Sequence, residues 1–389
     1  MRAADASADR VAVPAAVRPA GAAQAVTVRE YGTRYLRITV RYHGDARFSW
    51  QRVPGPAHDR PQTPPPPAAG AALRRVDAAL ADAGSGAGRG ARLALGEWDA
   101  ASEGGGVLYR VPGAVSVARL LPSGDDTAYR LSVGALADAG RTLRQLHDVP
   151  WEFGEPRPHH GVGRLLAWLS ASDDAPTENA TDDVRLRALA RERLGPRLWT
   201  RLTDWAEAAQ EPPGRGGEVL LHGAPSTGWL VPSPAGDHSV LLTGEEVTGG
   251  DPALDLGWVL GELHELRSAA TRGLGAAGQG PPVDYPAAAR ALLAGYLRTA
   301  DVTADVTAGV TADVTAGVTA GVTAGVGANL LTEKATVALP PGTERAATLR
   351  LAVHMRDFAS FVGWHEDLRH YADLLAETLD ADGAPTLRW

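Results

Sequence analysis

The residues that could do acid–base or metal chemistry gather in two short segments. The first, "VLLHGAPSTGWLV" (219–231), holds His222, and the second, "VLLTGEEVTGGDPALDLGWVL" (240–260), holds Glu245, Glu246, Asp251 and Asp255. Histidine and carboxylate side chains at the ends of apolar runs can move a proton or hold a metal ion. Between residues 222 and 250 the only other acid lies in the turn "PAGDHS", so chemistry that needs carboxylates has few residues to use.

The composition excludes several kinds of site and partner. The 389 residues include no cysteine, which rules out disulfides, thiolate zinc sites and a cysteine nucleophile. No window reaches about 18 uninterrupted apolar residues, so we expect no membrane span, no secretion signal and a cytoplasmic location. The net charge is −8 and basic residues are not densely interleaved with aromatic ones, so nucleic acid is not expected as a partner.

The elements that must position these segments fall into two groups. Residues 1–24 are predicted to be a disordered tail. After it, "AVTVREYGTRYLRITVRYHGDARFSWQRVPG" alternates aromatic or β-branched residues with arginine and predicts antiparallel strands with a turn at "HGD". A helix at "AALRRVDAALADA" and strands at "RLALGEW" and "GVLYRVPG" complete a small α+β unit.

The remainder of the chain is predicted to be mainly helical. Apolar residues recur at helical spacing in "LSVGALADAGRTLRQLHDVP", "GVGRLLAWLSAS", "DDVRLRALARERL", "RLWTRLTDWAEAAQ", "PALDLGWVLGELHELRSAA", "YPAAARALLAGYLRTA", "TLRLAVHMRDFASFVGW" and "HEDLRHYADLLAETLD". The two segments with chemistry form a hairpin of short strands within this helical sequence. Residues 299–328 repeat Thr-Ala-(Asp/Gly)-Val, in which glycine and β-branched residues oppose a helix, so we predict a flexible low-complexity insertion.

In this order, the segments resemble the aminoglycoside phosphotransferase and choline kinase-like family. "GRTLRQLHDVP" is similar to the family's helix ending in Leu-His-x-x-Pro, "VLLHGAPSTGWLV" to its catalytic loop H-G-D-x-x-x-x-N, and "VLLTGEEVTGGDPALDL" to its metal-binding segment followed by G-D-P-x-x-D-L. The resemblance implies an α+β fold of the bilobal protein-kinase-like type. Its small antiparallel-sheet N-lobe would span residues 25–112, and its larger, mainly helical C-lobe residues 113–389.

The resemblance also places unsuitable side chains where the family carries out phosphoryl transfer. Ala224 stands at the catalytic aspartate of the loop and Trp229 at its metal-binding asparagine. A methyl group accepts no proton, and an indole offers only an N–H donor. Counting back seven residues from the glycine of "GDP" places Thr243 at the metal-binding aspartate, where a neutral hydroxyl is a poor ligand.

Substitutes for the missing groups can be named. The strand lysine of the family would fall near Gln51 or Arg52, and Arg52 could contact phosphate. Glu245 or Glu246 could reach a metal ion if the strand before them ends two or three residues later than the alignment suggests. By the same resemblance, the strand and linker residues Tyr109, Arg110 and Val111 would border an adenine ring.

The residues that hold the loop in place are present. The resemblance assigns this role to His222 and Asp255, while Asp251 is suited to cap the helix that begins at Pro252. Near the end of the chain, "FVGWHEDLRHY" brings together Trp364, His365 and Asp367, where the family places acceptor contacts. The alternative for these three residues is a packed core with a solvated face.

Three functions follow from these residues. The first is a pseudokinase that needs no cofactor and binds a protein, a peptide or a nucleotide as a scaffold or regulator, which relatives in actinobacterial natural-product clusters suggest for a peptide pathway. The second is an active phosphotransferase that uses ATP and Mg²⁺ on a small-molecule or peptide hydroxyl. The third is a non-phosphorylating enzyme that uses Glu245, Glu246 or Ser226. The missing acids favour the first.

Overall fold

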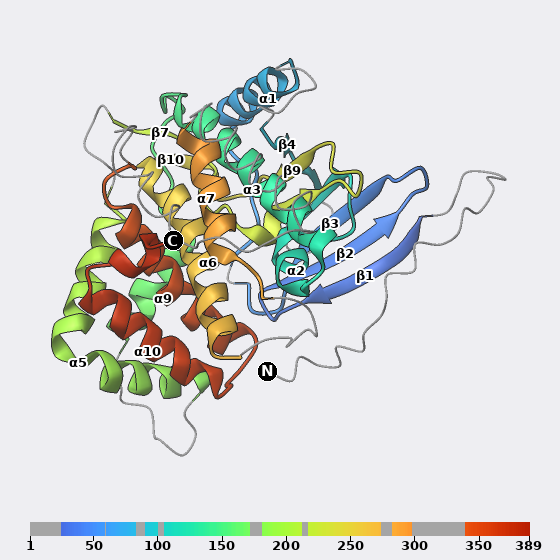
Figure 1. The fold of residues 1–389 in the computed structure, drawn as a ribbon. Helices are drawn as coiled ribbons and strands as arrows, with labels where there is room; N and C mark the ends of the chain where they lie inside the picture. The colour runs from blue at the N-terminus through green and yellow to red at the C-terminus, as the bar shows by residue number, and fades with distance from the viewer. Residues whose placement is uncertain are drawn as a thin grey trace, which may run out of the picture.

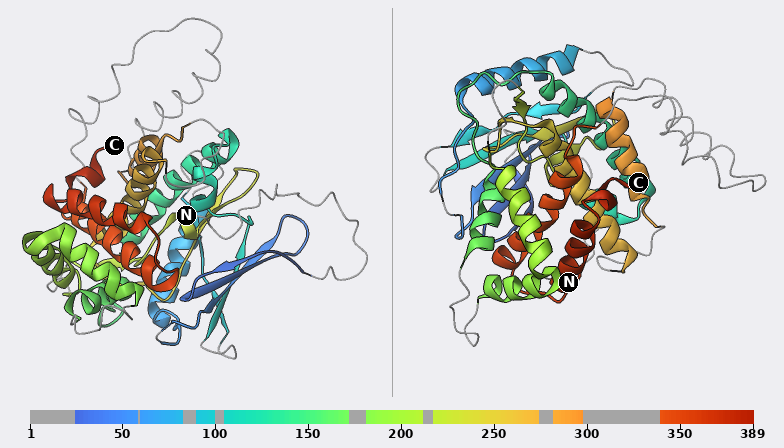
Figure 2. Two further views of the ribbon diagram at one scale, coloured as in Figure 1. Left: turned by 90° about the horizontal axis from the view of Figure 1, so that it is seen from below. Right: turned by 90° about the vertical axis from the view of Figure 1, so that its left-hand side faces the viewer.

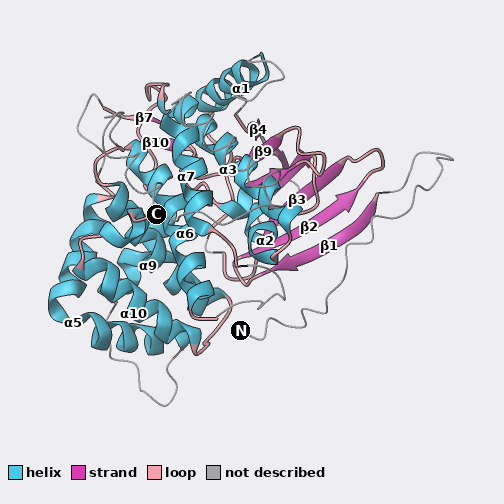
Figure 3. Ribbon diagram, viewed as in Figure 1, coloured by secondary structure: helices cyan, strands magenta, loops and turns pink. Residues whose placement is uncertain are grey.

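The chain folds into a sheet lobe and a larger helical lobe. The computed structural model describes residues 25–58, 60–82, 90–99, 105–171, 181–211, 217–273, 282–297 and 339–389. The strands of the sheet lobe gather on one side of the molecule and the helices on the other (Figures 1 and 3). The predicted fold class is therefore confirmed: the fold is α+β and bilobal, with a small antiparallel sheet and a mainly helical second lobe, an arrangement typical of the protein-kinase-like fold.

The sheet lobe is built on five antiparallel strands in the order β1-β2-β3-β6-β5. Their bounds are β1 Val26–Gly32, β2 Leu36–Tyr42, β3 Phe48–Pro54, β5 Glu97–Asp99 and β6 Gly106–Val111. Alternation along the strands buries Val40, Trp50 and Tyr109 on one face, as the period of two requires. The same apolar cluster includes Val231 and Leu242 from the helical lobe, so the inner face of the sheet packs on the segments that carry the site.

One predicted strand divides into two with different partners. "RLALGEW" forms β4 (Arg92–Ala94) and β5, and only β5 joins the five-stranded sheet. β4 instead pairs in parallel with β9 (Ser239–Leu242) of the helical lobe. The physical reason is Asp77 on α1 (Pro67–Asp82), which accepts hydrogen bonds from the Arg92 side chain at 2.7 and 2.6 Å and from the backbone N–H of Leu93 at 2.8 Å.

The short strands that hold the site lie between the helices and the five-stranded sheet (Figure 2). The helices of the helical lobe are α2 Val117–Leu120, α3 Asp126–His147, α4 His160–Ser170, α5 Asp182–Ala208, α6 Pro252–Thr271, α7 Tyr285–Leu297, α9 Thr343–Phe361 and α10 Asp367–Asp380, with 3-10 turns at Leu121–Ser123 and Ala384–Leu387. The two helices predicted between 182 and 210 run together as α5, and the break between them lies at Gly195, with φ of 60°, followed by Pro196. α3 packs along α7 and α6 along α9.

Four short strands frame the two segments with chemistry. β8 (Leu230–Pro232) and β9 form the antiparallel hairpin that the sequence predicts, while β7 (Val219–Leu221) pairs with β10 (Thr248–Gly250). The loop 222–226 and the 3-10 turn η3 (Thr227–Trp229) therefore connect β7 to β8, and residues 243–247 connect β9 to β10. The two connections are held at neighbouring ends of paired strands.

Some predictions concern residues beyond this description. The tail at 1–24 and the whole insertion at 299–328 lie outside the described residues. Within the described part of the chain, none of the helices combines the length and the apolar character that crossing a bilayer requires.

Candidate functional site

Asp255, on the first turn of α6, holds the loop after β7. Its carboxylate accepts hydrogen bonds from the backbone N–H groups of His222 at 2.7 Å and Gly223 at 2.8 Å, and lies 3.1 Å from the ring nitrogen Nε2 of His147. Asp255 is fully buried. Burial by itself would raise the pKa of Asp255, but the hydrogen bonds and the nearby histidines outweigh it, so the pKa is lowered and the carboxylate stays ionised.

The His222 side chain ties the loop to β9. Its Nε2 lies 2.9 Å from the carbonyl oxygen of Leu242, and burial lowers the pKa of His222, so the neutral ring donates this hydrogen bond. The next residue, Gly223, has φ of +90°, and a Cβ there would lie 1.8 Å from the carbonyl oxygen of Glu246. Only glycine fits this close approach, which packs the loop directly on the segment 243–246.

A second buried carboxylate, which the sequence prediction missed, fixes the other end of the loop. Glu262 accepts hydrogen bonds from the backbone N–H of Thr227 at 2.8 Å and from its hydroxyl at 2.7 Å. Glu262 follows Asp255 by seven residues, or two helical turns, so both acids lie on one face of α6. Two acids seven residues apart, with only apolar residues and glycine between them, are the signal that could have identified the pair.

Asp251 caps α6. Its side chain accepts a hydrogen bond from the backbone N–H of Ala253 at 2.8 Å, and Pro252 occupies the first helical position. The helix that carries both loop-holding acids therefore begins at a defined residue.

Arg52, Trp229 and Thr243, which the sequence analysis singled out, are linked by a short series of contacts. The Arg52 guanidinium lies over the indole ring of Trp229, 3.5 Å from its centroid. Arg52 also donates to the Tyr109 hydroxyl at 3.2 Å, and that hydroxyl donates to the carbonyl oxygen of Thr243 at 2.6 Å. The Thr243 hydroxyl donates to the carbonyl oxygen of Ala94 at 3.0 Å, so it is turned to β4. We call Arg52, Tyr109, Trp229 and Thr243 the arginine–tryptophan cluster.

The neighbouring predicted residues point elsewhere. Gln51 accepts a hydrogen bond from Arg41 at 2.9 Å, as expected because consecutive strand residues face opposite sides of a sheet. Arg110 is exposed and pairs with Glu97 at 2.9 Å, while Val111 is buried in the sheet-lobe core. Of the residues predicted to border an adenine or contact phosphate, only Arg52 and Tyr109 therefore reach the cluster.

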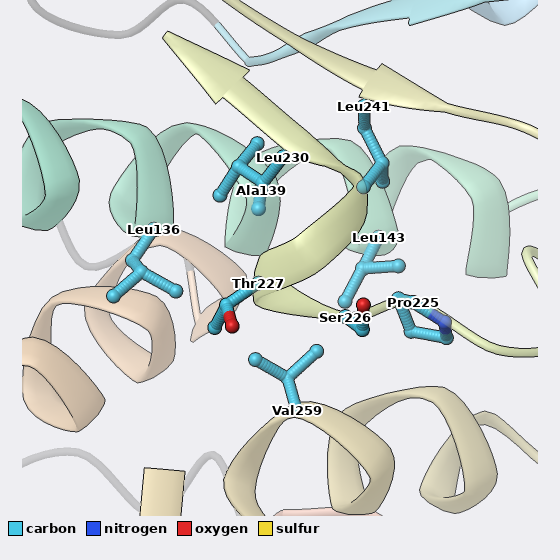
Figure 4. Close-up of a pocket in the computed structure, with 9 residues that line it drawn as sticks. All are labelled: Leu136, Ala139, Leu143, Pro225, Ser226, Thr227, Leu230, Leu241 and Val259. Carbon is cyan, nitrogen blue, oxygen red and sulfur yellow. The ribbon is translucent and has the colours of Figure 1, made fainter. Parts of the chain in front are cut away.

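The space behind the loop is small and mostly apolar. A cavity of about 10 Å³ lies behind the loop, and Figure 4 shows the side chains that line it. It is lined by Leu136, Ala139, Leu143, Pro225, Ser226, Thr227, Leu230, Leu241 and Val259. A cavity of this size holds at most one water molecule, so it offers no site for a substrate next to Ser226. Ala224 packs against the apolar core of the helical lobe and carries no polar group.

The acids that could replace the missing aspartates have basic partners. Glu245 lies 3.3 Å from the Arg60 guanidinium and 3.6 Å from Nε2 of His58. Glu246 lies 3.0 Å from Nδ1 of His160. Burial would raise the pKa of Glu246, but the hydrogen bond with His160 and the positive charges nearby lower it to about 2. Both carboxylates therefore face basic side chains, Glu245 those of His58 and Arg60 and Glu246 that of His160.

The residues predicted as an acceptor or partner surface are engaged with their neighbours at the start of α10. The guanidinium of Arg185 lies 3.7 Å from the ring centroid of Trp364, whose indole N–H donates to Glu366 at 3.3 Å. His365 pairs with Asp367 at 3.1 Å. The Trp364 ring also packs at the edge of the helical core, in accordance with the alternative of a core residue on a solvated face.

Comparisons with known proteins report likeness to phosphotransferases of low sequence identity. No protein-family model and no curated protein matches the chain. Among solved structures, it is similar to a choline/ethanolamine kinase family protein from Mesorhizobium loti, at 16% identity over 95% of this chain and 92% of the other, with a TM-score of 0.42. It is also similar to spectinomycin phosphotransferase in complex with ADP and spectinomycin, at 10% identity over 92% and 93% of the chains and a TM-score of 0.44. A macrolide 2'-phosphotransferase from Brachybacterium faecium is 18% identical over 90% and 91%, with a TM-score of 0.34.

Proposed function

We propose that this chain is a phosphotransferase-like protein without catalytic activity, a pseudokinase, that works by binding. The observation that carries the proposal is the stacking of Arg52 on Trp229 at 3.5 Å. It joins the position expected to bind nucleotide phosphates to the position expected to bind Mg²⁺, and it leaves neither free for that task.

Phosphoryl transfer requires three kinds of group, and in the arginine–tryptophan cluster each of them is either absent or already engaged. A cation must contact the phosphates, oxygen ligands must hold the metal ion, and an acid or amide must orient the acceptor hydroxyl. The Arg52 guanidinium already contacts the Trp229 ring and the Tyr109 hydroxyl. A half-buried cation–π contact of this kind is worth about 1–2 kcal/mol, which a phosphate would have to exceed to displace it. Ala224 supplies no group for the third task.

The turn between β1 and β2 closes the same region from the sheet lobe. The backbone N–H of Arg34 donates to the carbonyl oxygen of Phe361 at 3.1 Å, and the Tyr35 ring stacks between Phe361 at 4.6 Å and His58 at 4.4 Å. Arg164 donates to the Tyr35 hydroxyl at 3.1 Å. These contacts fasten the turn to the helical lobe, so that opening the interlobe space to a nucleotide would break several of them together.

The retained contacts of the loop support a binding role. Two buried carboxylates hold a loop that has no catalytic acid, and burying such groups is costly unless they are fully paired. A loop that is held firmly but has no catalytic acid suits a scaffold or regulator that contacts a protein or a peptide, including a partner enzyme of a peptide natural-product pathway.

The test is an assay of ADP formation from ATP with Mg²⁺ or Mn²⁺, with a peptide serine and a sugar hydroxyl as acceptors. We expect no turnover above the buffer rate. The double variant Ala224→Asp/Thr243→Asp should also be inactive, because Trp229 still fills the remaining metal position. Turnover by the natural chain that disappears in Glu246→Gln would support the alternative, an active phosphotransferase with rearranged acids.

A further inference from the structure

A group of bases and acids joins the two lobes beside the loop. His160, at the start of α4, lies with Glu245 and Glu246 so that one ligand atom from each falls within 4.8 Å of the others. His58, which follows β3 in the sheet lobe, adds its Nε2 atom at 3.6 Å from Glu245 Oε1. We call these four residues the interlobe His–Glu group.

Two of its members, His58 and Glu245, are buried, and within the described part of the chain each has one side-chain atom without a hydrogen bond. The side chain of His58 is 1% exposed and that of Glu245 7% exposed. Among the residues that the structure describes, neither His58 Nε2 nor Glu245 Oε2 has a hydrogen-bond partner. Leaving a buried polar atom without a hydrogen bond costs about 1–3 kcal/mol, so two such atoms on neighbouring side chains require a physical cause.

The tautomer of His58 makes a cation the natural cause. Its Nδ1 contacts the backbone carbonyl oxygen of Arg60, so that nitrogen carries the proton in the neutral ring. In the neutral ring the lone pair of Nε2 then faces the Glu245 carboxylate, and two acceptors at this distance repel unless a proton or a metal ion lies between them. A histidine that donates one N–H to a backbone carbonyl and presents the other nitrogen is the usual arrangement of a metal ligand.

The Arg60 guanidinium supplies a positive charge next to Glu245, but its contact with His160 is incompatible with the contact between His160 and Glu246. Its guanidinium lies 3.3 Å from Glu245 Oε2 and also contacts His160 Nδ1. That same nitrogen lies 3.0 Å from Glu246 Oε2. One nitrogen cannot offer a lone pair to the arginine and a proton to the carboxylate. The Arg60 side chain is 32% exposed and can therefore turn outward.

We propose that His160, Glu245 and Glu246, whose ligand atoms already lie together, bind one Zn²⁺ ion in the place of the Arg60 guanidinium, and that the ring of His58 turns toward this ion as its fourth ligand. In a tetrahedral site with bonds of about 2.1 Å, neighbouring ligand atoms are about 3.4 Å apart. The two measured ligand pairs, at 3.6 and 3.0 Å, lie on either side of this value. Two imidazole nitrogens favour Zn²⁺ over Mg²⁺, which prefers oxygen ligands alone. With four protein ligands the ion would fasten the sheet lobe to the helical lobe.

The experiment titrates the full chain, stripped of metal by a chelator, with ZnSO₄ in competition with a chromogenic zinc indicator. We expect saturation at one equivalent and no competition from millimolar Mg²⁺. Glu245→Gln and His58→Ala should each weaken binding by more than roughly tenfold, since each removes a ligand. His238→Ala is the matched control: it removes a histidine that pairs with an acid at 2.9 Å in an exposed turn, and should leave the affinity unchanged.

The decisive variant is Arg60→Ala, because it changes no proposed ligand. Removal of the competing charge should tighten zinc binding by roughly tenfold or more. Absence of saturable binding by the folded chain, equal affinity in the ligand variants and the control, or weaker binding by Arg60→Ala would each overturn the proposal. No nucleotide is used, so this result is independent of the proposed function.

Discussion

Replacing Asp255 by Asn tests whether this carboxylate holds the loop. The substitution keeps the shape of the side chain but removes the charge and one of its two acceptor oxygens. The carboxylate accepts from two backbone N–H groups, at 2.7 and 2.8 Å, and contacts His147 at 3.1 Å. An amide NH₂ would face at least one of these donors.

The magnitude follows from the burial of the site. Hydrogen bonds to a charged group contribute about 1.5–3 kcal/mol each, and breaking a fully buried charged network costs about 3–5 kcal/mol. We therefore expect Asp255→Asn to lower the free energy of unfolding by about 3–5 kcal/mol. Urea denaturation followed by circular dichroism measures the change. Asp45→Asn is the control, because Asp45 has a side chain that is 91% exposed and a φ of 50° that asparagine tolerates.

The pH dependence provides a second readout of the same contact. The pKa of Asp255 is lowered in the folded state, so its contribution is present above the unfolded pKa of about 3.9 and is lost as the pH falls through the folded pKa. The difference between the natural chain and Asp255→Asn should therefore shrink below about pH 4. A loss under about 1 kcal/mol at pH 7, or one equal to that of Asp45→Asn, would refute the role of Asp255.

Two further substitutions examine the rest of the loop. Gly223→Ala should lower the free energy of unfolding by more than about 3 kcal/mol in urea denaturation, or prevent folding, because its Cβ would lie 1.8 Å from a carbonyl oxygen at a φ of +90°. The control is Gly134→Ala, at an open position on α3, which should not destabilise the chain. Equal effects of the two substitutions would contradict the close approach at Gly223. Glu262→Gln should lower the free energy of unfolding by about 1–3 kcal/mol, since the Gln side chain has only one acceptor oxygen for the two donors of Thr227. An unchanged midpoint of urea denaturation would count against this contact.

Much of the fold could be predicted from local patterns. The alternation in β2 and β3 and the helical spacing of α3, α6 and α10 come from residues near one another in sequence. Capping by Asp251 depends only on the next two residues, and an aspartate directly before a proline is a local signal for the start of a helix. These elements could be predicted because the residues that determine them are close together in the sequence.

Other features depend on residues far apart in the chain. The parallel pairing of β4 with β9 arises from the anchoring of Arg92 by Asp77 on a separate helix, which no strand pattern reveals. The stacking of Arg52 on Trp229 and the approach of His58 to Glu245 also join segments that only the folded chain brings together. Sequence analysis could name Arg52, Trp229 and Glu245 individually, but not which of them would touch.

Calorimetric titration of the natural chain with ATP, with and without Mg²⁺, tests the central claim most directly. If the arginine–tryptophan cluster fills the phosphate and metal positions, the titration should show no binding that depends on Mg²⁺. Trp229→Ala, which frees the Arg52 guanidinium, should bind ATP more tightly than the natural chain, with no gain on adding Mg²⁺. Saturable, Mg²⁺-dependent binding of ATP by the natural chain, accompanied by release of ADP, would contradict the account.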